Sequence, residues 1–198
     1  KTMTEPAKPQ SYFIAAIPDP GIAERVKAIS REFKDRFAAS ASFRNIPNIS
    51  VSGIFRIAPA LLPQVRFALR GRLAEYTAFA SELSGFDGFD EHTIFIRVMN
   101  QKPFVELGRA ISALLKLRIG RSPGFMATPH LTVAYRDLSS ENYRLAIPEF
   151  RKREFHAVMQ IASLCLMHQD RGWKLIEEFP LAGKRDYTPR QMDLFAAP

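Results

Sequence analysis

Cysteine and long apolar runs are both scarce in this chain of 198 residues. Its single cysteine, Cys165, has no partner within the chain, which excludes a scaffold held together by internal disulfides. The apolar neighbours Leu164 and Leu166 indicate a buried structural thiol rather than a nucleophile. The longest apolar runs, such as residues 13–17, are far shorter than the roughly 20 residues that span a bilayer. We therefore expect no membrane-spanning segment.

We also expect no export signal. Residues 1–10 are polar, contain two prolines and lack the apolar middle of a signal peptide. Together with the lone cysteine, this favours the cytoplasm. The hydrophobic fraction of 46% and the charged fraction of 24% are typical of a folded globular protein. We expect a flexible segment at 1–10, a single domain at 11–180 and an exposed tail at 181–198.

Positive charge is in excess, with 28 Lys and Arg against 20 Asp and Glu, a net charge of +8. This balance suits an anionic ligand, but it does not choose among RNA, DNA, nucleotides and membrane surfaces. No cluster of histidine, cysteine or carboxylate residues has metal-ligand spacing, and no glycine-rich phosphate loop is found. We therefore expect neither a metal nor a cofactor.

A strand–helix–strand–helix order occurs twice along the chain. In the first unit, residue type and apolar spacing predict strands at 11–17 and 48–57, helices at 19–37 and 63–83, and a glycine-interrupted strand or turn at 83–89. The second unit has strands at 93–98 and 130–135, helices at 103–117 and 139–150, and closing strands at 155–168 and 173–179. Residues 13–17 align with 94–98 at an offset of 81, and 47–51 with 129–133 at an offset of 82. The matching order and spacing indicate an internal duplication.

The strongest chemical signal is the segment from Pro129 to Val133. On a strand, His130 and Thr132 face one side, while Leu131 and Val133 face the other. An imidazole moves a proton near neutral pH, and a hydroxyl donates a hydrogen bond to a phosphate oxygen. Taken alone, the segment is more simply explained by a surface histidine at the start of a strand.

The first unit contains a counterpart in which Asn48 and Ser50 share one strand face. Lobes related by a pseudo-twofold axis would place this pair opposite His130 and Thr132 in one groove. With these two motifs, residues 11 to 180 resemble the 2H phosphoesterase superfamily, in particular its 2'-5' RNA ligase-like branch. That family carries a His-x-Thr/Ser-x motif in each of two duplicated lobes, and residues 130–133 match the motif fully.

The resemblance implies a two-lobed α+β fold, in which each lobe has an antiparallel sheet with flanking helices and the ligand groove lies between the lobes. It also implies a metal-independent 2',3'-cyclic phosphodiesterase or 2'-5' RNA ligase-like activity on RNA ends or nucleotides. His130 would be the catalytic acid or base, and Thr132 and Ser50 would bind the phosphate.

Asn48 departs from the family pattern, which has a histidine there. An amide donates and accepts hydrogen bonds but does not titrate near neutral pH, so Asn48 can orient a phosphate but cannot serve as a general acid or base. Three hypotheses follow: a slow phosphodiesterase working through His130, an enzyme with another proton donor in its groove, or a catalytically inactive module that binds RNA ends or nucleotides. His92, His156 and His168 lie outside any such motif.

Further candidates flank the two motifs. Strand alternation places Arg136 on the face of His130 and Thr132, with Tyr135 toward the core. The same alternation gives Arg56 and Ser52 the face of Asn48 and Ser50. Either arginine would suit a phosphate, although a solvated charge at a strand end is the simpler explanation.

The tail carries a separate signal in the sequence Gln191-Met192-Asp193-Leu194-Phe195. It resembles the short peptide by which bacterial replication and repair proteins bind the sliding clamp, with Gln191 as a polar anchor and Leu194 and Phe195 for an apolar pocket. The alternative is a tail that folds back onto its own domain. We expect the protein to be a monomer.

Overall fold

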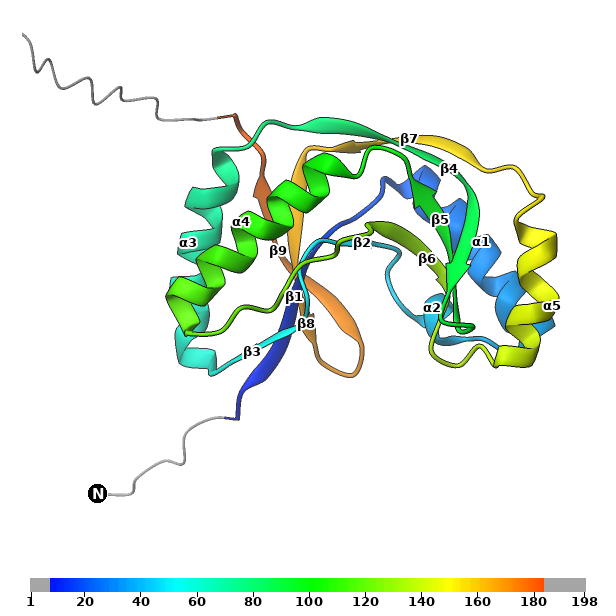
Figure 1. The fold of residues 1–198 in the computed structure, drawn as a ribbon. Helices are drawn as coiled ribbons and strands as arrows, with labels where there is room; N and C mark the ends of the chain where they lie inside the picture. Colours follow the sequence, from blue (N-terminus) through cyan, green and yellow to red (C-terminus); the bar gives the residue numbers. More distant parts are fainter. Residues whose placement is uncertain (1–7, 184–198) are drawn as a thin grey trace, which may run out of the picture.

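The computed structural model describes residues 8–183 and has one twisted antiparallel sheet with helices packed against it (Figure 1). The strand order is β7-β4-β5-β6-β2-β1-β8-β9, and β3 pairs with β1. Along the chain the elements are β1 (Gln10–Ala16), α1 (Pro20–Phe37), α2 (Ala41–Arg44), β2 (Ile49–Ser50), β3 (Phe55–Ile57), the 3-10 turn η1 (Pro59–Leu61), α3 (Leu62–Ala74), β4 (Phe79–Phe89), β5 (Thr93–Val98), α4 (Lys102–Ile119), β6 (His130–Ala134), α5 (Ser140–Phe150), β7 (His156–Ile161), β8 (Ser163–Gln169) and β9 (Trp173–Pro180).

The sheet has two halves that meet where β2 pairs with β6. One half contains β7, β4, β5 and β6 and is covered by α1 and α5, whereas the other contains β2, β1, β8 and β9 and is covered by α3 and α4 (Figure 1). Each lobe therefore combines segments from both ends of the chain. The expected two-lobed α+β fold is confirmed, and the sheet is continuous from one lobe to the other.

The helices retain the duplication closely. Both α1 and α4 have 18 residues, and their first and last residues differ by the same offset, 82 (102 − 20 and 119 − 37). Each has a proline in its first turn and ends at a left-handed residue, Ala38 with φ 53° and Gly120 with φ 72°. Glycine adopts this conformation without strain and alanine does not, yet both helices end in the same geometry.

The sheet register corrects one alignment in the sequence analysis. Ala15 pairs with Ser50 and Phe95 pairs with Thr132, so β1 and β5 are related by an offset of 80 (95 − 15) rather than 81. A shift of one residue moves every side chain of a strand to the other face. The corrected offset pairs Ile14 with Ile94, and both are fully buried.

Apolar side chains fill both faces of the sheet near its centre. The main core lies under the helices and includes Phe33, whose ring centroid is 4.4 Å from that of Phe150. On the other face, a smaller cluster contains Phe13, Ala15, Cys165 and Met167, with Trp173 packed against it. Burial raises the pKa of Cys165 to about 12, and the negative charge of Glu178 adds to the rise, as befits a structural thiol.

Three of the elements expected from the sequence differ in the structure, either in where they end or in being divided into two strands. The single strand expected at 48–57 is divided into β2 and β3, because the chain at Gly53 passes so close to Pro123 that a Cβ there would lie 2.0 Å from the Pro123 carbonyl oxygen. The helix expected at 63–83 ends at Ala74, and β4 begins at Phe79. The strand expected at 155–168 is two strands, β7 and β8, which pair with β4 and β1 respectively. The short helix α2 was not expected.

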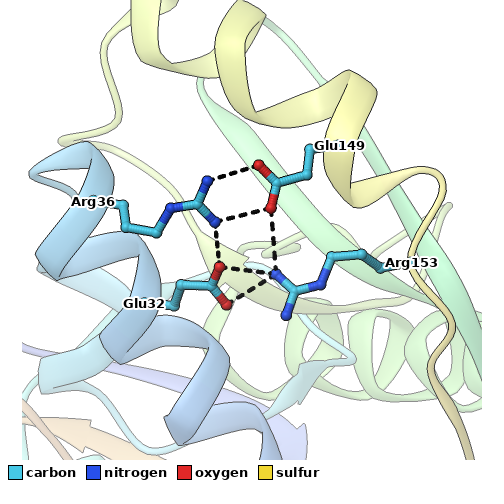
Figure 2. A network of polar contacts seen from close by, with 4 residues as sticks. All are labelled: Glu32, Arg36, Glu149 and Arg153. Atoms are coloured by element: carbon cyan, nitrogen blue, oxygen red, sulfur yellow. Dashed lines mark hydrogen bonds and ion pairs between the residues drawn. The ribbon is translucent and has the colours of Figure 1, made fainter.

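An ion-pair network joins α1 to α5 on the lobe that these helices cover (Figure 2). The Arg36 guanidinium donates to both Glu149 carboxylate oxygens, at 2.8 and 2.7 Å, and also to Glu32. Arg153 donates to the Glu32 oxygens at 3.0 and 2.9 Å. The hydrogen bonds from Arg36 hold the pKa of Glu149 below its ordinary value. Because the pairs are largely exposed, they fix how the two helices dock more than they add to stability.

Two segments lie outside the described residues, 1–7 and 184–198. The clamp-like sequence with Gln191, Leu194 and Phe195 falls in the second, so its two explanations stay predictions. None of the helices within 8–183 has the length and apolar character that crossing a membrane requires.

Candidate active site

The two motif strands are neighbours in the sheet. Ile49 of β2 pairs with Leu131 of β6 in an antiparallel register, and both side chains are fully buried in the core. The register extended by one position places Asn48 opposite Thr132 and Ser50 opposite His130. Since side chains alternate along a strand, these four project from the face opposite Ile49 and Leu131. The structure therefore brings the two sequence motifs together at the seam between the lobes.

A cavity of about 400 Å³ lies on this face. Asn48, Ser50 and Thr132 line it together, and Phe13 and Trp173 contribute apolar surface from β1 and β9. His130 lies beside the cavity rather than in its lining, on the strand position opposite Ser50. The arrangement is a partly apolar hollow with hydroxyl and amide groups at the seam and an imidazole at its edge.

The hydrogen bonding of His130 fixes its tautomer. Its Nδ1 lies 2.7 Å from the Thr128 carbonyl oxygen, and because a carbonyl only accepts, Nδ1 carries the proton. The ring also packs against Phe89 and Phe95, with centroids 5.1 and 4.9 Å away. Burial lowers the pKa of His130, and the hydrogen bond to Thr128 offsets part of this effect. A neutral ring with Nδ1 protonated presents an unprotonated Nε2, which is the form a general base needs.

The outer nitrogen of His130 is available to a ligand. Nε2 accepts and donates no hydrogen bond within residues 8–183, and it is not among the fully covered polar atoms of that part of the chain.

Asn48 repeats the backbone contact of His130. Its Nδ2 donates to the Ile46 carbonyl at 2.9 Å, two residues earlier, as His130 Nδ1 does to Thr128. The Ser50 hydroxyl donates to Asn48 Oδ1 at 3.2 Å. Asn48 therefore reproduces the inner half of a motif histidine but has no counterpart of Nε2.

Of the remaining predicted site residues, Arg136 and Ser52 line the cavity and Arg56 does not. Arg136 lines the cavity, and its φ of 67° turns the chain sharply after β6. Ser52 also borders the cavity, but its side chain is buried. Its hydroxyl is already used by the backbone, since it accepts from Ile14 N and donates to the Gly53 carbonyl, both at 2.9 Å. Arg56 is exposed, contacts the Pro9 carbonyl and does not line the cavity, because the break between β2 and β3 ends the alternation on which its placement relied.

Several lining residues were missed in the sequence. Tyr135 was expected in the core, yet it lines the cavity because β6 ends at Ala134 and the chain turns there. Ser42 and Asn45 belong to the unexpected helix α2 and its C-cap, and Trp173 opens β9. No local pattern marks these residues, since their placement depends on long-range packing. His92, His156 and His168 do not line the cavity.

Comparisons with known proteins agree with this arrangement. A family model described as the 2'-5' RNA ligase superfamily matches residues 18–173. The structure of E. coli LigT complexed with 3'-AMP has a TM-score of 0.58 and 14% identity, covering 88% of this chain and 99% of that one. The structure of TT0787 of Thermus thermophilus has a TM-score of 0.61 and 17% identity, covering 88% and 100%. At these identities, both show a shared fold. A search of the curated proteins finds no match.

Proposed function

The chain belongs to the 2'-5' RNA ligase superfamily, the 2H phosphoesterases, and we propose that it is a phosphodiesterase acting on 2',3'-cyclic or 2'-5' phosphodiesters of RNA or nucleotides. The observation that carries the proposal is His130, a neutral imidazole whose Nε2 has no partner within 8–183, beside a cavity lined by Thr132, Ser50 and Asn48. We assign proton transfer to His130 and phosphate binding to the hydroxyls of Thr132 and Ser50.

For a 2',3'-cyclic phosphate, the reaction is an attack of water on phosphorus. The water oxygen forms a bond to phosphorus while His130 Nε2 takes its proton, and the bond from phosphorus to one ribose oxygen breaks. The departing oxygen receives a proton from solvent, leaving a ribose monophosphate. Thr132 donates to the non-bridging oxygens, where negative charge builds up, and Ser50 does the same once its hydroxyl turns away from Asn48 Oδ1. Asn48 orients the phosphate through the Nδ2 hydrogen that it does not donate to Ile46.

Because position 48 has no histidine, we expect hydrolysis to be slow. A correctly placed general acid contributes about 10²- to 10⁴-fold, and Asn48 cannot supply it. The protein is therefore proposed to be a slow enzyme in which His130 alone transfers a proton at the seam.

The test is hydrolysis of a 2',3'-cyclic nucleotide by the full chain, followed by chromatography. The sharpest variant is His130→Asn, because an asparagine keeps the contact with the Thr128 carbonyl, as Asn48 does with Ile46. It removes Nε2 together with the ring that packs against Phe89 and Phe95. We expect turnover to fall by about 10²- to 10⁴-fold. His156→Asn, an exposed histidine outside the cavity, is the matched control and should leave turnover unchanged. Turnover that survives His130→Asn refutes the assignment.

A second function is favoured by the hydrogen bonding of Asn48. Its Oδ1 accepts from Ser50 and its Nδ2 donates to Ile46, and because an amide does not titrate near neutral pH, nothing at this position moves a proton. The protein would then be a catalytically inactive module that recognises RNA ends or nucleotides. Binding of a cyclic nucleotide without any turnover supports the module, and turnover abolished by His130→Asn excludes it.

A further inference from the structure

The cavity wall formed by α2 and the end of β6 carries neutral polar groups that the phosphate chemistry does not use. They are the Ser42 hydroxyl, the Asn45 amide and the Tyr135 hydroxyl, all in the lining. These three groups carry no charge at neutral pH, whereas the guanidinium of Arg136, which follows Tyr135 and also lines the cavity, is the kind of group that binds a phosphate. Ser42, Asn45 and Tyr135 are therefore suited to a neutral ligand group with hydrogen-bonding atoms on its edge.

Ser42 has an unmet hydrogen-bonding requirement. The residue is only 8% exposed, and within 8–183 its Oγ is fully covered and has no hydrogen-bond partner. Leaving a buried hydroxyl unpaired costs stability, because the group has lost its water without gaining a partner. A ligand atom in the cavity, met by a rotation of Ser42 about its Cα–Cβ bond, would supply the partner.

Asn45 and Tyr135 present an acceptor and a donor side by side. Asn45 uses both Nδ2 hydrogens, one to the Ala41 carbonyl at 3.0 Å and one to the Tyr135 hydroxyl at 2.8 Å. Its Oδ1 is thereby fixed as an acceptor. The Tyr135 oxygen accepts from Asn45, so its own hydrogen is left for another acceptor, and no such acceptor occurs within the described chain. A ligand that fills this wall must offer both a donor and an acceptor.

Aromatic and aliphatic surface contributes another part of the lining. Trp173 and Phe13 pack edge to face with centroids 4.5 Å apart, and Ile46 lies in the same lining. A flat ring with donors and acceptors on its edge fits such a combination of apolar surface and polar wall. We propose that this end of the cavity is a nucleobase subsite, in which Ser42, Asn45 and Tyr135 hydrogen-bond the edge of a base that lies against Trp173.

The proposal rests on the proposed function and narrows its substrate. The phosphate is bound at the seam by Thr132 and Ser50, and the base of the same nucleotide is read at the α2 wall. The substrate class is therefore a nucleoside cyclic phosphate or an RNA end with its terminal base in place. A sugar cyclic phosphate that has no base should bind poorly.

Titration calorimetry tests the subsite with three ligands: adenosine 3'-monophosphate, ribose 3-phosphate and inorganic phosphate. We expect the nucleotide to bind at least about tenfold more tightly than the sugar phosphate. Ser42→Ala and Tyr135→Phe should each weaken nucleotide binding by about 3- to 10-fold, the effect of losing one neutral hydrogen bond, and leave ribose 3-phosphate unaffected. Ser42→Ala removes no hydrogen bond of the fold, so this variant should fold normally.

Ser81→Ala is the matched control. Ser81 is also buried, at 1% exposure, and its Oγ is also without a partner within 8–183, but it lies in β4 away from the cavity lining. It should leave all three affinities unchanged. Equal affinity for the nucleotide and the sugar phosphate, or an equal loss on Ser42→Ala and Ser81→Ala, would overturn the subsite.

The two proposals fail in different ways. If the cyclic phosphate of a sugar without a base is hydrolysed as fast as a cyclic nucleotide, the phosphodiesterase stands and the base subsite is refuted. If nucleotides bind with the expected losses in Ser42→Ala and Tyr135→Phe but no cyclic phosphate is hydrolysed, the subsite stands and the phosphodiesterase is refuted.

Discussion

Replacement of Asn48 by histidine is expected to restore a second proton-transfer group at the seam. Asn48 Nδ2 donates to the carbonyl two residues earlier, which is the contact that His130 Nδ1 makes on β6. A histidine at position 48 can form the same bond through Nδ1–H, and its Nε2 then extends toward the cavity that Asn48 lines. The change also removes Oδ1, the acceptor of the Ser50 hydroxyl, and so releases that hydroxyl for the phosphate.

The size of the gain follows from the missing step. A positioned general acid that protonates the departing oxygen contributes about 10²- to 10⁴-fold, equivalent to about 3–5 kcal/mol of the activation barrier. We expect Asn48→His to raise kcat for a 2',3'-cyclic nucleotide by this factor. The assay is steady-state hydrolysis measured between pH 5 and 9. A bell-shaped profile in place of a single rising limb would identify the new group as an acid.

Two further variants separate catalysis from other effects. Asn48→Gln retains an amide that does not titrate and should give no gain. Combining Asn48→His with His130→Asn should remove most of the gain, because the base is then missing. If Asn48→His folds and binds the nucleotide as the parent does but shows no increase in kcat, the two motifs do not act together in one catalytic site.

Other expectations concern pH, reactivity and packing. Because burial lowers the pKa of His130 below its ordinary value of 6.5, turnover by the parent should rise with pH and reach its plateau by about pH 7. The unfolded chain binds that proton more readily than the folded one, so the free energy of unfolding, followed by urea titration, should decrease as the pH falls below 6.5. Cys165, with a pKa raised to about 12, should resist a thiol reagent at pH 8 until the protein is unfolded; rapid labelling of the native protein would contradict its burial. Gly108→Ala should destabilise by about 1–3 kcal/mol, because the added Cβ would lie 2.7 Å from the Val51 carbonyl, whereas Gly71→Ala in the open face of α3 should stabilise by up to about 1 kcal/mol. Equal effects of the two glycine changes on urea unfolding would refute the close approach of α4 to the segment after β2.

The alternation around the two motifs could be predicted because it is local, although the strand expected at 48–57 is divided into β2 and β3. Leu131 and Ile49 are strongly apolar, and their polar neighbours on either side leave only one way to face a core. The strand β6 and the helices α1 and α4 are found where residue type and apolar spacing placed them. The family resemblance is confirmed by the match over residues 18–173.

Other features of the fold depend on long-range packing and could not be predicted from local sequence patterns. Continued alternation from Ser50 to Arg56 required an unbroken strand, but the chain bends at Gly53, where it contacts the segment around Pro123. The apolar spacing that continues past Ala74 predicts helix up to residue 83, but the chain from Phe79 onward belongs to β4. The partners of β4 are β5 and β7, which later parts of the chain contribute. A single sequence contains no record of such partners. The cavity wall at Ser42 and Asn45 was missed for the same reason.

The continuity of the sheet explains why the site tolerates Asn48. Because β2 and β6 pair directly, the inner contacts of positions 48 and 130 hold the ends of two adjacent strands at the seam, and either a histidine or an asparagine can make them. The structural requirement at each position is a donor to the carbonyl two residues earlier, and the catalytic requirement is a second nitrogen pointing outward. Asn48 satisfies the first requirement alone, while His130 satisfies both. The two requirements are therefore separable at each position, and His130→Asn and Asn48→His should shift catalysis in opposite directions while leaving the fold in place.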